Sequence, residues 1–179
     1  LLIRHQLSFD TFHSKYESIY RVVSESEGNE GKGYSAGIPS VLTPTFKKDF
    51  PEAEAVAFTT YRSGATVSVP QASDMPKKFF EEAGVVFTEP SFFQIFDRPS
   101  LIGDAQKSID EPNEAVISRK LAIKYFGKED AVGELVEYED HQYKIGAVID
   151  DHGSNTDMPF DLLLSYETIR KKTEENGWN

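Results

Sequence analysis

The sequence contains no cysteine and no long apolar run, and it has fewer basic than acidic residues. The missing cysteines exclude disulfides and thiolate metal sites. No apolar run approaches the roughly 20 residues that a membrane-spanning helix needs. The chain has 19 Lys and Arg against 30 Asp and Glu, a net charge of −11. Nucleic acid is therefore not an expected partner, because binding it requires Lys and Arg to displace the counterions of phosphates.

Familiar catalytic motifs are also missing. The chain has no H-E-x-x-H and no G-x-x-x-x-G-K-[ST]. The last of these would supply the glycine loop that holds nucleotide phosphates. We therefore expect no enzyme and no catalytic, metal or cofactor-binding residues. Any ATP that drives this protein would bind a separate domain or subunit.

The residues that are present suffice for one hydrophobic core. The chain has 179 residues, of which 39% are hydrophobic, with 13 Phe and 8 Tyr. Predicted strands and helices alternate irregularly, which indicates the α+β class. We expect a mixed-sheet core lobe built from residues 1–53 and 88–179, with a smaller β-rich lobe, residues 54–87, inserted between them.

Apolar spacing and capping residues predict five helices. Phe9, Phe12, His13, Tyr16 and Ile19 share one face of the first. Gly127 is placed to end the fourth in the left-handed conformation. The predicted helices cover residues 9–20, 39–50, a short stretch after Pro90, 119–126 and 166–175.

Alternating apolar residues predict the strands. Those at 77–81 and 85–88 are expected to pair with each other through a turn at Ala83-Gly84. The segments 25–37 and 98–112 are expected to be polar loops. The remaining predicted strands are 56–61, 66–69, 115–117, 135–139, 142–149 and 160–164.

Two patterns could bind a metal. His13 and Glu17 lie four residues apart, so both could reach one ion on a helix surface. Residues 150–157 (DDHGSNTD) contain three aspartates, and calcium prefers such oxygen ligands. An ordinary helix surface explains the first pattern better. A turn in which Asp and Asn side chains bind nearby backbone N–H groups explains the second.

Two pairs of adjacent phenylalanines stand out: Phe79 with Phe80, and Phe92 with Phe93. They belong either to the core or to an apolar groove for a ligand or partner. Any of them that is exposed becomes the first candidate for an interaction surface.

Five segments together resemble one family. They are residues 10–23 (DTFHSKYESIYRVV), 50–56 (FPEAEAV), 89–96 (EPSFFQIF), Gly103-Asp104, and 112–165. In this order they resemble the extracytoplasmic, or periplasmic, core domain of MacB/FtsX-type ABC transporter permeases, in the form common in Bacteroidetes-like bacteria. The loop after the strand at 143–149 differs from an Asn-Ser-His-like tract often seen in relatives.

The resemblance implies that residues 1–179 form a single extracytoplasmic domain on the periplasmic face of an inner-membrane protein. It also implies mechanical coupling (mechanotransmission) rather than catalysis. A cytoplasmic ABC ATPase would move the membrane helices, and the outer domains would open and close to export a substrate, as in efflux. Expected partners are a second permease copy, in a homodimer or heterodimer, and a periplasmic adaptor or partner protein.

Other functions fit the same sequence. The main alternative is an FtsX-like regulatory domain, which binds and activates an extracytoplasmic partner such as a cell-wall hydrolase. A stand-alone periplasmic binding module for a small ligand or metal would need an enclosed polar pocket. The apolar start Leu1-Leu2-Ile3 suggests the end of a membrane helix, although an arbitrary chain boundary would look the same. The coupling hypothesis predicts that both chain ends lie at one pole.

Overall fold

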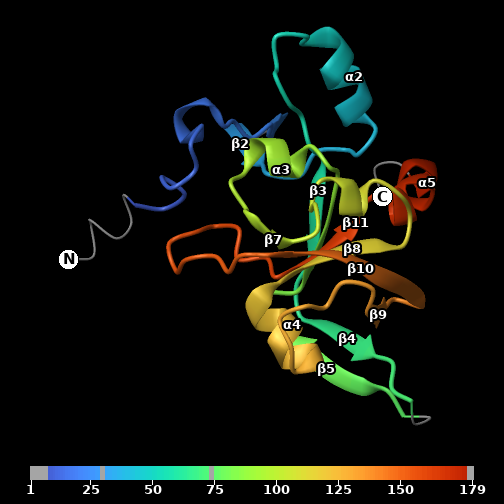
Figure 1. Ribbon diagram of the computed structural model, residues 1–179. Coiled ribbons are helices and arrows are strands. Elements are labelled where there is room, and N and C mark those ends of the chain that lie inside the picture. Colours follow the sequence, from blue (N-terminus) through green and yellow to red (C-terminus); the bar gives the residue numbers. More distant parts are fainter. Residues whose placement is uncertain (1–7, 29–30, 73–74, 177–179) are drawn as a thin grey trace.

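The computed structural model describes residues 8–28, 31–72 and 75–176 (Figure 1). Most of the described strands form one nine-stranded mixed sheet, and β1 and β2 form a separate hairpin. The helical elements are η1 (Tyr16–Ser18), α2 (Leu42–Asp49), α3 (Phe92–Ile95), η2 (Lys107–Ile109), α4 (Arg119–Phe126) and α5 (Glu167–Asn176). The strands are β1 (Ser24–Gly28), β2 (Gly31–Ser35), β3 (Thr59–Arg62), β4 (Ala65–Val69), β5 (Lys77–Glu81), β6 (Val85–Thr88), β7 (Ser100–Ile102), β8 (Glu114–Ser118), β9 (Leu135–Tyr138), β10 (His141–Ile149) and β11 (Leu162–Ser165).

The large sheet runs in the order β3-β6-β11-β8-β10-β9-β4-β5, with β7 paired to one end of β10. β8 pairs in parallel with β10, and β11 pairs in parallel with β6. The other pairs are antiparallel. Because β8, β11 and the second half of β10 are central and covered on both faces, their sequences are mostly apolar.

Residues 59–69 and 77–88 form the two arms of one long, bent hairpin that reaches both ends of the sheet. Its first half pairs β3 with β6, and its second half pairs β4 with β5. At the bend, Gly84 has a φ of +79°, and a Cβ there would lie 1.8 Å from the carbonyl oxygen of Arg62. The expected pairing of β5 with β6 is therefore wrong. Gly84 lies in the short bend between β5 and β6, where the backbone approaches Arg62 too closely for a side chain.

Two hydrophobic clusters cover the two faces of the sheet. Residues alternate between them along β6, β8 and β11: Ala115 and Ile117 of β8 belong to the larger cluster, and Val116 to the smaller. α4 packs on the larger cluster, and α3 and η2 pack on the smaller. In β10 the alternation shifts at Gly146, where a bulge interrupts the pairing with β8.

α4 matches its predicted bounds because both ends carry strong capping signals. The hydroxyl of Ser118 accepts a hydrogen bond from the backbone N–H of Leu121. Gly127 ends the helix with a φ of +71°, a conformation that costs a residue with a Cβ about 1–2 kcal/mol. Leu121, Ala122 and Tyr125 are its buried residues.

Three local predictions are wrong. Residues 9–20 form turns and the short η1 rather than an α-helix, because His13 alone of them is buried. Residues 25–37 contain most of the β1–β2 hairpin instead of a loop. The segment 98–112 contains β7 and η2, and the side chain of Ile109 is fully buried.

The α+β class is confirmed. All four strands of residues 54–87 join the large sheet, and their β4–β5 end projects from the molecule on the side opposite α2 (Figure 1). The division into lobes stays a prediction. The chain ends, and with them the prediction that they share a pole, lie outside the described residues. None of the described helices is long and apolar enough to cross a membrane.

Candidate functional site at the 150–161 loop

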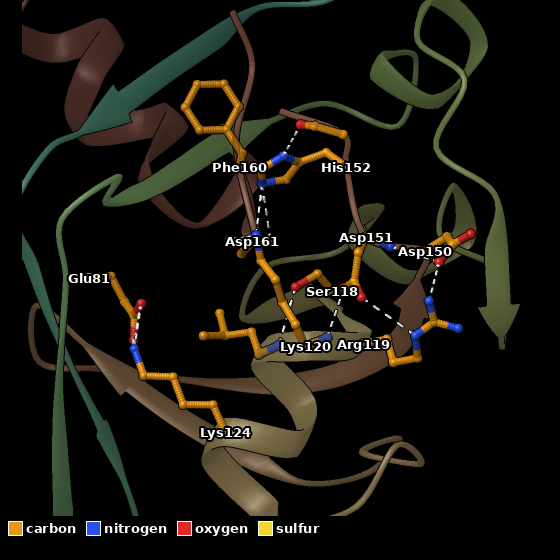
Figure 2. A network of polar contacts seen from close by, with 12 residues as sticks. Glu81, Ser118, Arg119, Lys120, Lys124, Asp150, Asp151, His152, Phe160 and Asp161 are labelled. Atoms are coloured by element: carbon orange, nitrogen blue, oxygen red, sulfur yellow. Dashed lines mark hydrogen bonds and ion pairs between the residues drawn. The ribbon is translucent and has the colours of Figure 1, made fainter. Parts of the chain in front are cut away.

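Residues 150–161 connect β10 to β11 and take part in a network of polar contacts (Figure 2). Arg98, which is 8% exposed, holds the two ends of this loop together. Its guanidinium donates to the carbonyl oxygen of Phe160 from both Nη atoms, at 3.1 Å each, and to that of Asp150 at 3.4 Å. Burial lowers the pKa of Arg98, and the nearby Asp161 carboxylate opposes that shift.

The N-terminal end of α4 binds the first residues of the loop. Arg119 Nη2 lies 2.8 Å from Asp150 Oδ1, and its Nε lies 3.5 Å from Asp151 Oδ2. The backbone N–H of Lys120 donates to Asp151 Oδ1 at 2.8 Å. A free N–H of the first helical turn is therefore satisfied by a carboxylate, which also interacts favourably with the helix dipole.

Lys120 also links His152, near the start of the loop, to Asp161 at its end. Its ammonium lies 3.0 Å from Asp161 Oδ2 and 3.0 Å from His152 Nε2. His152 Nε2 in turn lies 3.5 Å from Asp161 Oδ1. A separate ion pair joins α4 to β5: Lys124 contacts both carboxylate oxygens of Glu81, at 2.7 and 2.9 Å.

The tip of the loop binds the N-terminal segment, residues 8–14. Asp10 accepts a hydrogen bond from the Thr156 hydroxyl at 2.6 Å and one from the Asp157 N–H at 3.2 Å. Asn155 donates its side-chain amide to the Ser8 carbonyl at 2.8 Å and accepts the Asp10 N–H at 3.0 Å. Segments almost 150 residues apart in sequence are thus joined by four hydrogen bonds.

His13 provides a second attachment of the same segment. Its side chain is 3% exposed, and its Nδ1 accepts the backbone N–H of Asp97 at 3.0 Å. The Asp97 carboxylate accepts the backbone N–H of Ser14, which lowers the pKa of Asp97. Burial lowers the pKa of His13.

A separate buried carboxylate, that of Glu89, connects helices α2 and α5. It is 8% exposed and accepts the Phe58 N–H at 3.0 Å. Lys47 of α2 lies 3.2 Å from Glu89, and Arg170 of α5 lies 3.0 Å from it. These three donors to one carboxylate attach α2 and α5 to the residue that follows β6.

The two candidate metal patterns are used differently. His13 faces Asp10 and Asp97, whereas Glu17 is exposed and accepts the hydroxyl of Tyr16. In the 150–157 segment, the carboxylates of Asp150 and Asp151 bind Arg119 and backbone N–H groups. The N-terminal segment is bound by other groups of residues 155–157, none of them a carboxylate. Within the described ranges, three or more His, Cys, Asp or Glu side chains do not gather as a metal site would require.

The four phenylalanines of the proposed interaction surface lie in two places. Phe92 of α3 is 1% exposed and belongs to the smaller core cluster, with Phe93 packed against it. Phe79 of β5 packs on Tyr125, with ring centroids 4.6 Å apart. Phe80, on the other face of β5, is 65% exposed. Because Phe92 is buried in the core, it cannot belong to an interaction surface. Phe80 is exposed and stays a candidate.

Sequence reasoning missed Arg98 and Asp10 as organising residues. Each is a single charged residue whose partners lie far away in the chain, so no local spacing could indicate it. The dense 150–157 segment was recognised, but its role as the attachment of the N-terminal segment was not.

Comparison with known proteins identifies the family. The sequence model of one family, the MacB-like periplasmic core domain, matches residues 2–179. The chain belongs to this family. It is therefore the periplasmic core domain of a MacB-like ABC transporter permease, a class of domain that is generally non-catalytic.

Two solved structures share the fold. A domain of a candidate permease from Porphyromonas gingivalis has a TM-score of 0.66 and 18% identity, covering 88% of this chain and 65% of that one. The periplasmic region of MacB from Actinobacillus actinomycetemcomitans has a TM-score of 0.54 and 16% identity, covering 77% and 61%. The chain thus spans less than two thirds of these relatives. No curated protein sequence matches it significantly.

Proposed function

We propose that this MacB-like domain works by mechanotransmission in an inner-membrane export complex. ATP hydrolysis by a separate cytoplasmic ABC ATPase would move the membrane part of the permease. The domain, on the periplasmic side, would pass that motion to a substrate or to a periplasmic partner. The family match over residues 2–179 supports the permease context.

One observation carries the mechanical part of the proposal. Residues 8–14 are attached to the 150–161 loop, and that loop is fixed to the sheet by Arg98 and by the start of α4. Because β10 and β11 flank the loop and are central in the sheet, a pull on the N-terminal segment reaches the core without passing through a flexible connection. A layered, densely packed sheet transmits such a displacement as a rigid body.

The test is the side of the membrane on which the domain lies. The chain has no cysteine, so a single thiol introduced at exposed Ser63 or exposed Lys172 gives a specific signal in the full-length gene product freed of other cysteines. A membrane-impermeant maleimide should label Ser63→Cys and Lys172→Cys in intact spheroplasts. Labelling only after lysis would refute the proposal.

The same preparation separates export from regulation. Copurification with an ABC ATPase, and ATP-dependent release of a bound substrate, would support the export role. ATP-dependent activation of a cell-wall hydrolase, without release of any substrate, would instead support the FtsX-like regulatory role.

A further inference from the structure

The attachment of residues 8–14 depends on a buried histidine. His13 is 3% exposed, its ring packs 4.2 Å from the ring of Phe12 and 5.3 Å from that of Phe96, and it lines a small cavity with Arg98. This side chain joins the segment to Asp97, while Asp10, three residues earlier, joins it to the loop tip. The two attachment residues, Asp10 and His13, are therefore only three residues apart.

The hydrogen bond of His13 requires a neutral ring. Its Nδ1 accepts the backbone N–H of Asp97 at 3.0 Å, and an imidazolium has no acceptor nitrogen. Protonation at Nδ1 would place two N–H groups against each other at a buried position. The Asp97 N–H would lose its partner, and a cation would be buried without a hydrogen-bonded carboxylate.

The charges around His13 come from three segments. On its own segment, Asp10 Oδ1 lies 3.9 Å from His13 Nε2 and favours the cation. After α3, Asp97 favours the cation and Arg98 opposes it. From the loop, His152 lines the same cavity and would add a further positive charge if it were protonated.

Burial outweighs the two carboxylates, so the pKa of His13 is lowered from 6.5. A lowered pKa means that the attached state prefers neutral His13. Attachment is therefore strongest above about pH 6.5 and weakens as the pH falls toward the lowered value. Each unit of pKa difference between attached and released states weakens attachment by up to about tenfold.

We propose that His13 makes the attachment of residues 8–14 to the 150–161 loop a pH-sensitive latch, closed near neutral pH and opened by protonation in mildly acidic medium. The latch is a property of the contacts within this chain and stands independently of the proposed export function. A domain on the periplasmic side would meet such acidic medium directly.

The experiment is a pH titration of the isotopically labelled chain by NMR. The ring nitrogens of His13 report its tautomer and its titration. The backbone amides of Asn155 and Asp157, which lie at the loop tip, report attachment independently. We expect the Nε2–H tautomer above pH 7, and a shared midpoint below pH 6.5 for the ring and for both amides. Separate midpoints, or loop amides that do not change between pH 8 and pH 5, would overturn the proposal.

Two variants identify the titrating group. The side-chain oxygen of His13→Asn can accept the Asp97 N–H but cannot titrate, so the loop-tip transition should disappear. His152→Asn should keep the transition. Loss of the transition in His152→Asn, or its persistence in His13→Asn, would overturn the proposal.

Discussion

Replacing Arg98 by methionine should release the 150–161 loop from the sheet. The guanidinium donates to the carbonyl oxygens of Phe160 and Asp150 at the two ends of the loop, and the side chain is 8% exposed. Methionine preserves the apolar stem but removes every donor. Both carbonyls would lose a charged partner in a place that water reaches poorly.

The expected cost follows from these contacts. A hydrogen bond from a charged donor is worth about 1.5–3 kcal/mol, which gives about 3–6 kcal/mol for the two carbonyls. The substitution also removes the cost of burying the guanidinium, which offsets part of that loss. We therefore expect the free energy of unfolding to fall by about 2–4 kcal/mol.

Urea unfolding followed by circular dichroism measures this loss. With a slope of about 2 kcal/mol/M, the midpoint should fall by about 1–2 M. Arg62→Met is the control, because Arg62 is exposed and donates to Thr60 and to the Tyr61 carbonyl at the surface. It should change stability by less than about 0.5 kcal/mol. Equal midpoints for the two variants would refute the role assigned to Arg98.

Two further predictions concern the sheet and the buried tyrosines. Gly84→Ala should cost about 2–5 kcal/mol in urea unfolding, because of its φ of +79° and the contact with the Arg62 carbonyl; an equal cost for Gly28→Ala, which meets no atom within 4 Å, would contradict the account of the bend. Burial raises the pKa of Tyr138 to about 12, and burial also raises the pKa of Tyr143. Because both folded-state pKa values are raised, their contribution to stability is complete below about pH 10 and is lost as the pH rises above it. An ultraviolet titration should therefore show these tyrosines ionising above pH 10, whereas ionisation of all eight near pH 10 without unfolding would contradict their burial.

The sequence predicted elements whose ends carry local signals. β5, β6 and α4 match their expected bounds, since glycines and an N-cap serine mark them. Strand partners were less predictable. The sequence around Gly84 resembles a hairpin turn, but β5 and β6 pair with β4 and β3 and not with each other.

Residues 9–20 show the limit of apolar spacing. Phe12 and Tyr16 follow a helical period, yet they are 44% and 48% exposed. A short amphipathic helix is stable when its apolar face packs on a core. Here the segment is held instead by hydrogen bonds of Asp10 and His13 to distant residues, and no spacing within the segment could predict those partners.

The family resemblance, unlike the site, could be predicted from the sequence. It rests on five segments in order, and the match over residues 2–179 confirms it. The segments themselves are mostly structural: residues 112–165 contain three central strands, α4 and the loop between β10 and β11. Their order reflects the fold, which explains why they indicate the family without identifying a functional residue.

The most direct test of mechanical coupling is thiol labelling of the N-terminal segment during ATP turnover. The complete permease, with its ATPase, would be labelled at Ser14→Cys in separate ATP, ADP and vanadate-trapped samples. Exposed Thr66 of β4, as Thr66→Cys, is the control. Coupling predicts that the labelling rate at position 14 changes with the nucleotide state while that at position 66 stays constant. Equal rates at position 14 in all states, in a complex that hydrolyses ATP, would contradict it.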